Sequence, residues 1–232
     1  MKTIGLIGGM SWESSIEYYR IINETAKEKL GGLHSAKSLM ISVDFAEIEK
    51  LQHEGQWDEA AQILIRCAQD LERGGADFIV LCTNTMHKIA DQIAENIQIP
   101  FLHIADATAE KIQAAGLKKI GLLGTRFTME HNFYKGRLIK NFGLDVLVPI
   151  EADRTIVHHV IYRELVLGKI MDNSREEYKR IMNALIQQGA EGIILGCTEI
   201  ELLIRQSDSS VPLFPTSAIH AIAAVEKALE DA

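Results

Sequence analysis

Short apolar runs bounded by glycine alternate along the chain with longer segments whose apolar residues recur every three or four positions. The run TIGLIGG precedes a helical pattern over residues 11–30, and a helical pattern over residues 58–76 precedes the run DFIVLCTN. This alternation predicts β-α units and a parallel sheet covered on both faces, because the strands of such sheets are apolar throughout. The predicted fold class is therefore α/β.

The sequence contains an internal repeat of this pattern. KTIGLIGG from Lys2 matches KKIGLLGT from Lys118, and RGGADFIVLCTNT from Arg73 matches QQGAEGIILGCTE from Gln187. The two matches are separated by nearly the same distance, which is typical of a duplicated fold. We expect two pseudo-symmetric lobes, each a parallel sheet flanked by helices, with the active site in the cleft between them. The expected lobes are residues 1–115, completed by a C-terminal helix over 211–232, and residues 116–210.

Aligning the two repeats pairs Thr83 with Cys197, and Cys82 with Gly196. Side chains alternate faces along a strand, so a Cys197 that points into the cleft implies that Thr83 does too, while Cys82 points away. Ligands of parallel sheets bind beyond the carboxyl ends of the strands, where both motifs fall. The register therefore predicts Thr83 and Cys197 as the reacting groups, and Cys82 as a core residue.

Two groups on opposite faces of one carbon, with no metal or cofactor motif, fit racemisation or epimerisation best. An ordinary thiol has a pKa of about 8.5 and is only slightly ionised at neutral pH, so it needs help to act as a base. Helical patterns follow both strand ends, and we expect the N–H groups at their starts to favour a thiolate or a substrate carboxylate. The residues expected to donate, cap or orient there are Asn84, Thr85, Thr198 and Glu199.

Two glycine-rich turns add further helix starts. In GGMSWESS, Gly8 and Gly9 allow the backbone to approach an anion, and Ser11 or Ser14 is expected to cap the next helix. The counterpart in the second repeat is GTRFTMEHNFY, which offers Thr125 and Thr128.

The charge composition limits the kinds of partner that the chain is expected to bind. The 232-residue chain has 32 acidic and 24 basic residues, so nucleic acid and anionic membrane surfaces are poor partners and a small molecule is favoured. No stretch has the length of a signal sequence or membrane span. Three cysteines without zinc-type spacing predict free thiols in a reducing cytoplasm and no metal site, with Cys67 at a core position.

The motifs GLIGGMSWESS, LCTNTMHKIA, HIADAT, GLLGTRFTM and GIILGCTEI resemble the aspartate/glutamate racemase family. The resemblance implies a two-domain, usually homodimeric α/β enzyme that needs no pyridoxal phosphate or other cofactor and uses two cysteines as a base and acid pair. The usual first motif is Cys-Asn-Thr, whereas this chain has Thr83 before Asn84. Cys197 matches the second cysteine, which acts on the L-enantiomer. Gly9 and Met10 lie in the first motif as substrate-binding candidates.

Other interpretations remain open. Lys169 follows Gly168 at a helix end, where it is either a partner of the helix dipole or a clamp on a substrate carboxylate. His87, His103 and His220 are expected to be structural. The closest rivals to a racemase are a maleate isomerase or arylmalonate decarboxylase, which act on small dicarboxylates, and an amino acid binding protein without activity. A nucleotide-binding module is weaker, because GLIGGM lacks the full GxGxxG spacing.

Overall fold

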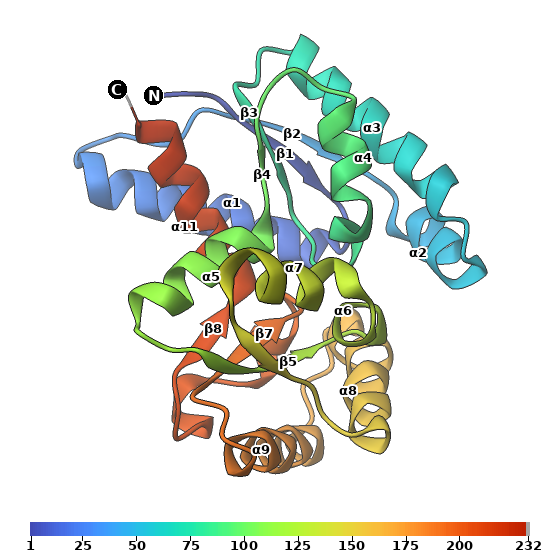
Figure 1. Ribbon diagram of the computed structural model, residues 1–232. Helices are drawn as coiled ribbons and strands as arrows, with labels where there is room; N and C mark the ends of the chain where they lie inside the picture. The colour runs from blue at the N-terminus through green and yellow to red at the C-terminus, as the bar shows by residue number, and fades with distance from the viewer. Residues whose placement is uncertain (231–232) are drawn as a thin grey trace. The chain divides into compact units, whose positions relative to one another are not determined.

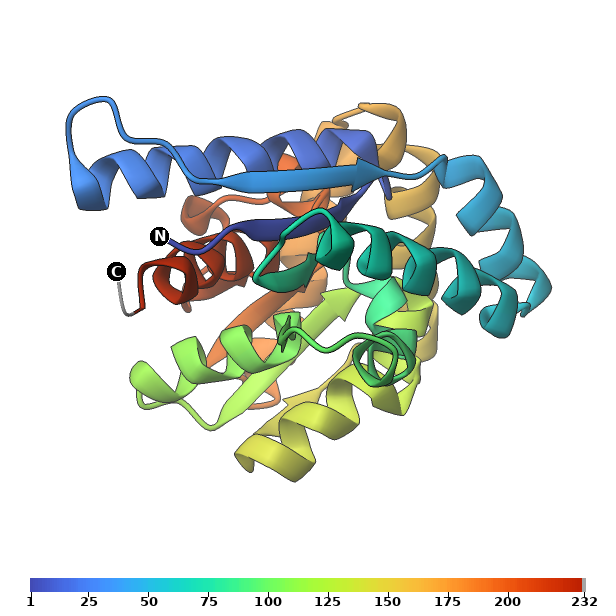
Figure 2. The same cartoon turned by 90° about the horizontal axis from the view of Figure 1, so that it is seen from above.

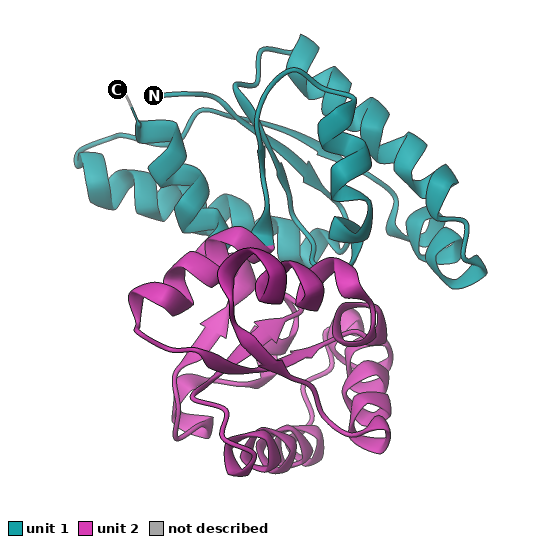
Figure 3. Cartoon of the chain, viewed as in Figure 1, with its two compact units in different colours: residues 1–104, 220–232 teal, residues 105–219 magenta. Residues whose placement is uncertain are grey.

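The computed structural model describes residues 1–230 and divides into two compact units (Figures 1 and 3). Unit 1 comprises residues 1–104 and the chain from His220 onward, and unit 2 comprises residues 105–219. Each unit is built on one four-stranded sheet in which all strand pairs are parallel. The α/β class and the two-lobed organisation expected from the sequence are confirmed.

Unit 1 has the strand order β2-β1-β3-β4, with β2 along one edge (Figure 2). Its strands are β1 (Ile4–Gly8), β2 (Ser38–Ser42), β3 (Phe78–Leu81) and β4 (Phe101–Leu102). Its helices are α1 (Trp12–Leu30), α2 (Phe45–Glu54), α3 (Trp57–Arg73), the 3-10 helix η1 (Thr85–Ile89), α4 (Ala90–Glu95) and most of α11 (Thr216–Leu229).

The two faces of the unit 1 sheet carry separate apolar cores. Ile79 and Leu81 of β3 pack in a cluster with α2, α3 and α4, whereas Phe78 and Val80 pack in a second cluster with α1 and α11. This division follows from the alternation of side chains along a strand. It explains why β3 is apolar and buried at every position.

Unit 2 repeats the topology with the strand order β6-β5-β7-β8. Its strands are β5 (Lys119–Gly124), β6 (Asp145–Leu147), β7 (Gly192–Gly196) and β8 (Leu213–Pro215). Its helices are α5 (Ile104–Ala114), α6 (Arg126–Glu130), α7 (Asn132–Phe142), α8 (Glu151–Arg163), η2 (Leu165–Leu167), α9 (Asp172–Gln187), α10 (Ile200–Leu203) and η3 (Gln206–Asp208). The helices α8 and α9 pack with β5 and β7 in one core cluster.

The unit boundaries differ from the expected lobes 1–115 with 211–232, and 116–210. Helix α5 belongs to unit 2, where Asp106 makes a two-point ion pair with Arg137 of α7 at 2.5 and 2.7 Å. Residues 213–215 also belong to unit 2, because β8 pairs with β7. Only the later part of the expected C-terminal helix joins unit 1, and residues 231–232 lie outside the described residues.

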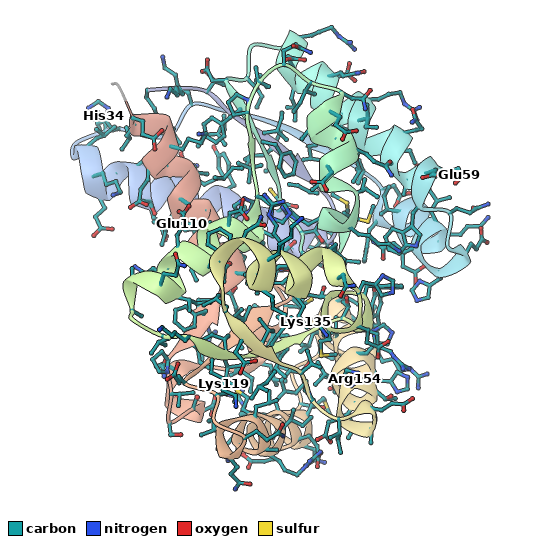
Figure 4. The ribbon with its side chains drawn as sticks, viewed as in Figure 1. His34, Glu59, Glu110, Lys119, Lys135 and Arg154 are labelled. Atoms are coloured by element: carbon teal, nitrogen blue, oxygen red, sulfur yellow. The ribbon has the colours of Figure 1, made fainter. Side chains whose placement is uncertain are left out.

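The repeat extends to individual hydrogen bonds. Asp77 and Glu191 hold matching positions just before β3 and β7. The carboxylate of Asp77 accepts the N–H of Thr3 at 2.5 Å, and that of Glu191 accepts the N–H groups of Lys118 and Lys119 at 2.8 and 2.9 Å. These backbone donors lower the pKa of Glu191. Each carboxylate thereby holds the backbone at the start of the first strand of its unit, β1 or β5. Figure 4 labels Lys119, the first residue of β5.

Candidate functional site

The carboxyl end of β7 presents Cys197, Thr198 and Glu199 in the turn before α10. Glycine is needed at position 196, because a Cβ there would lie 2.8 Å from the carbonyl oxygen of Leu123 on β5. Strands β5 and β7 are therefore packed so closely at the end of β7 that its last residue has no side chain. Cys197 is the first side chain beyond it and is partly buried.

The three side chains form one hydrogen-bonded group. The thiol of Cys197 donates to Oε2 of Glu199 at 2.9 Å, and the hydroxyl of Thr198 donates to the same oxygen at 2.7 Å. Burial raises the pKa of Cys197 well above its ordinary value, and the negative charge of Glu199 raises it further. Cys197 is therefore a neutral thiol at neutral pH, and its proton points at a buried carboxylate.

The expected help from backbone N–H groups at the helix start is present, but it is too weak to ionise this thiol. Helix α10 has a single turn and begins only at Ile200, so the dipole behind it is small. The backbone N–H of Glu199 does lower the pKa of Cys197, but burial and the Glu199 carboxylate outweigh it. The side chain that sequence reasoning placed there to assist the substrate is the one that holds the thiol proton.

The carboxyl end of β3 separates Cys82 from Thr83. Cys82 is fully buried in the cluster that includes α1 and α11, with its Sγ 3.9 Å from the carbonyl oxygen of Val80. Burial raises the pKa of this thiol strongly, so it stays neutral. Its position as a core residue is confirmed, as is the core position of Cys67 on α3.

Thr83, Asn84 and Thr85 continue from β3 into the 3-10 helix η1 and are all less than a tenth exposed. The backbone N–H of Thr83 donates to the carbonyl oxygen of Leu81 at 2.9 Å, which turns the chain sharply after the strand. The carbonyl oxygen of Thr83 accepts from Nδ1 of His87 at 2.7 Å. The helix that follows is thus irregular at its start, and a side chain completes its first turn.

The glycine turn of unit 1 places Gly9 and Met10 before α1. Gly9 has a φ of 93°, and a Cβ on it would lie 2.2 Å from the carbonyl oxygen of Val43, so this position admits glycine alone. The N–H of Gly9 donates to Oγ of Ser15 at 2.8 Å. Met10 is 4% exposed and packs in the core cluster with α2 and α3. Substrate contacts from Gly9 and Met10 stay predictions.

Helix caps follow both glycine turns, as expected. Ser11 caps α1 by accepting the N–H of Ser14 at 3.4 Å, and Thr125 caps α6 by accepting the N–H of Thr128 at 3.3 Å. Lys169 follows Gly168, whose φ of 69° ends η2. Its backbone N–H donates to the carbonyl oxygen of Glu164 at 3.0 Å and its side chain is exposed, so its role as a clamp stays a prediction.

The sequence pattern predicts only a structural role for His87 and assigns no role to Ser15. The signal for His87 was its spacing, because a side chain four residues after Thr83 reaches the carbonyl group one turn back. The signal for Ser15 was weaker, since a serine inside a helix start has many other uses.

Comparison with known proteins places these features in a family. Residues 7–224 match the sequence profile described as Asp/Glu/Hydantoin racemase. The chain belongs to this racemase family. This membership makes the protein an enzyme of the isomerase class, an amino acid racemase.

Individual members of the racemase family are similar over most of the chain. A proposed Asp/Glu racemase from Yersinia pestis is 56% identical with a TM-score of 0.94, over 99% of this chain and 100% of the other. An aspartate racemase homologue from Pyrococcus horikoshii OT3 is 36% identical with a TM-score of 0.85, over 98% and 99%. A broad-specificity amino-acid racemase of Bacillus subtilis is 27% identical over 164 residues, which is 69% of each chain.

Two further observations apply to residues 1–230, the part of the racemase that the structure describes. Within that range, histidine, cysteine, aspartate and glutamate side chains nowhere gather in threes as a metal ion would need. None of the helices described there combines the length and apolar character that crossing a membrane takes.

Proposed function

We propose that this racemase interconverts the enantiomers of aspartate, glutamate or both without a cofactor, and that it favours the L-enantiomer through Cys197. The observation that carries the proposal is the hydrogen bond of 2.9 Å between the Cys197 thiol and the buried Glu199 carboxylate at a strand end. A thiol beside a carboxylate is one acid and one base that share a single proton. Thr83 holds the matching strand end of the other repeat.

Removal of the substrate α-proton requires the thiolate of Cys197. In the proposed step the thiol proton moves to Oε2 of Glu199, and the thiolate then takes the α-proton of the L-enantiomer. The electron pair of the broken C–H bond passes into the substrate carboxylate as an enolate. The pair Cys197–Glu199 keeps its total charge during the first transfer, which makes a thiol of raised pKa usable as a base at neutral pH.

Return of a proton to the opposite face is assigned to Thr83. Its hydroxyl gives a proton to the α-carbon and receives one from water in the same step, because a free alkoxide is too basic to form at neutral pH. The Cys197–Glu199 pair then releases its extra proton through solvent to the hydroxide that remains, which restores the starting state. The hydroxyl serves as a relay but not as a strong base. The D-enantiomer should therefore lose its α-proton much more slowly than the L-enantiomer.

Substrate recognition completes the proposal. Asn84, Thr125 and Thr198 lie just beyond the strand ends, Thr85 begins η1, and all four are proposed to offer donors to an amino acid carboxylate. Lys169 is proposed to pair with the side-chain carboxylate, which would explain a preference for acidic amino acids. The working form is proposed to be a homodimer in the cytoplasm.

Proton NMR in deuterated water tests the proposal with each enantiomer of aspartate and glutamate. The α-proton signal of an L-substrate should disappear, and that of a D-substrate should fade slowly or not detectably. Thr83→Cys should accelerate the D-reaction by supplying a second thiol. Equal exchange of the two enantiomers in the unmodified enzyme, or an unchanged D-reaction in Thr83→Cys, would refute the role of Thr83.

The same measurement separates the rivals. Retained binding of L-aspartate or L-glutamate without α-proton exchange would identify a binding protein, in which Thr83 has disabled the reaction. Turnover of maleate or an arylmalonate instead of amino acids would identify a dicarboxylate isomerase or decarboxylase.

A further inference from the structure

We infer that His87 is a positioning residue for Thr83, held in the neutral tautomer whose proton is on Nδ1. The inference rests on the proposed role of Thr83 in the reaction. Nδ1 of His87 lies 2.7 Å from the carbonyl oxygen of Thr83, and Nε2 lies 3.1 Å from the backbone nitrogen of Ile104. All three groups belong to unit 1, and His87 is 2% exposed.

The two hydrogen bonds determine the tautomer. The amide of Ile104 is a donor, so Nε2 of His87 must be unprotonated to accept from it. A carbonyl oxygen only accepts, so Nδ1 must carry the proton that reaches Thr83. A doubly protonated ring would aim an N–H group at the amide of Ile104 and lose that bond. The geometry therefore selects one of the three protonation states of the ring.

The local backbone explains why a side chain is needed here. In an α-helix the carbonyl group of residue 83 would accept from the N–H of residue 87. In this turn the N–H of His87 instead donates to the carbonyl oxygen of Asn84 at 3.1 Å, as in a 3-10 helix. The imidazole takes the place of the missing backbone donor, and it thereby sets the orientation of the peptide group that follows Thr83.

The surroundings of His87 restrict its ring. The ring centroid of His103 lies 4.5 Å away, and that of His220 lies 5.9 Å away. His220 is itself held between the hydroxyl of Tyr18 at 2.9 Å and the carbonyl oxygen of Leu102 at 3.0 Å. Buried and packed on aromatic rings, His87 has little freedom to leave Thr83.

The tautomer is tested without any activity. A long-range proton–nitrogen NMR correlation spectrum of the unmodified enzyme should show a protonated Nδ1 and an unprotonated Nε2 for His87, with the signal assigned by its loss in His87→Asn. Protonation of Nε2, or of both nitrogens, would overturn the inference. This result does not depend on whether the enzyme racemises aspartate or glutamate.

Two variants then separate the two hydrogen bonds. In His87→Asn the side-chain amide nitrogen can occupy the place of Nδ1 and keep the bond to Thr83. In His87→Gln the terminal oxygen can occupy the place of Nε2 and keep the bond to Ile104 alone. Both variants are made in the Thr83→Cys background, where the alkylation rate of the new thiol by iodoacetamide, followed by mass spectrometry, reports how firmly position 83 is held.

Compared with Thr83→Cys alone, His87→Gln should raise the alkylation rate at position 83 at least about fivefold, and His87→Asn should leave it within about twofold. The reason is that a closed turn shields a side chain that an open turn exposes. Equal rates in the two variants would contradict positioning through Thr83. His53→Gln is the matched control, because Nδ1 of His53, an exposed residue of α2, lies 3.0 Å from the carbonyl oxygen of Glu49 in the same type of bond. It should leave the rate unchanged.

The positioning role also predicts an effect on inversion that a packing role would not have. In the enzyme with Thr83 intact, His87→Gln should slow conversion of L- to D-substrate more than it slows α-proton exchange of the L-substrate through Cys197. Equal loss of the two rates would assign His87 to general stability. If the unmodified enzyme shows neither α-proton exchange nor inversion, the proposed function is wrong. The tautomer and alkylation results would still test the position of His87.

Discussion

Replacement of Glu199 by glutamine separates the electrostatic effect of this carboxylate from its effect on the reaction. Glu199→Gln keeps the shape of the side chain and a hydrogen-bonding amide, but it removes the negative charge whose oxygen lies 2.9 Å from the thiol of Cys197. That charge is the second cause, after burial, of the raised pKa of Cys197. The pKa of Cys197 should therefore fall in the variant.

The size of the shift follows from Coulomb's law. Two unit charges 4 Å apart interact by about 4 kcal/mol at an effective dielectric constant of about 20, which corresponds to about 3 pKa units. Cys197 is partly exposed, and solvent screening reduces this energy, so the pKa of Cys197 should fall by less than the unscreened interaction would give. The thiolate fraction at a pH below the pKa rises about tenfold for each unit.

Alkylation by iodoacetamide measures the change. A less basic thiolate is also less nucleophilic, which cancels about half of the gain on a logarithmic scale, so the rate at Cys197 should rise about 3- to 10-fold. The midpoint of the rate against pH should move to lower pH. Exchange of the substrate α-proton should instead fall at least about tenfold, because in the proposed step the thiol proton passes to Oε2 of residue 199 while substrate occupies the site, and glutamine cannot accept it.

The opposite directions of these two changes are the decisive result. Slower or unchanged alkylation in Glu199→Gln would refute the claim that the Glu199 charge holds the proton on sulfur, and unchanged α-proton exchange would refute its role as acceptor. Glu201→Gln is the matched control, because Glu201 is the weakest of the causes that raise the pKa of Cys197. Its alkylation rate should stay within about twofold of the unmodified enzyme.

Three further substitutions have defined outcomes. Cys197→Ser should abolish α-proton exchange in the NMR assay with an unchanged circular dichroism spectrum, because an alkoxide forms far less readily than a thiolate. Cys82→Ala should keep its turnover and lose about 1 kcal/mol of unfolding free energy in urea, since it removes one fully buried sulfur atom; lost turnover at full stability would contradict its core position. Gly9→Ala should lower the free energy of unfolding by more than about 2 kcal/mol, because its Cβ would lie 2.2 Å from the carbonyl oxygen of Val43. Gly55→Ala is the control and should cost about 1 kcal/mol, because no atom lies within 4 Å of its added Cβ. Equal costs in the two variants would show that the clash at Gly9 is relieved.

The α/β class and the duplicated organisation could be predicted from the sequence, because both depend on patterns that repeat locally along the chain. Strands such as β3 and β7 are buried on both faces, so they must be apolar runs whatever surrounds them. The position of Cys82 could also be predicted, since alternation along a strand and alignment of the repeats need no knowledge of the helices that cover it.

Domain boundaries were harder to predict, because they depend on which unit a segment packs against. The ion pair between Asp106 and Arg137 and the pairing of β8 with β7 join residues that are distant in sequence. Nothing in the local pattern of α5 distinguishes a helix that closes one unit from a helix that opens the next.

The protonation of Cys197 and the hydrogen bonds beside Thr83 were decided by tertiary structure alone. The sequence placed Cys197 at a strand end before a helical pattern, which favoured a lowered pKa, yet the helix proved to have one turn and burial raised the pKa. Likewise, the order of residues along the chain does not reveal that Nε2 of His87 meets the amide of Ile104. Charge and tautomer depend on desolvation and on bonds a few ångströms long, and such distances exist only once the chain has folded.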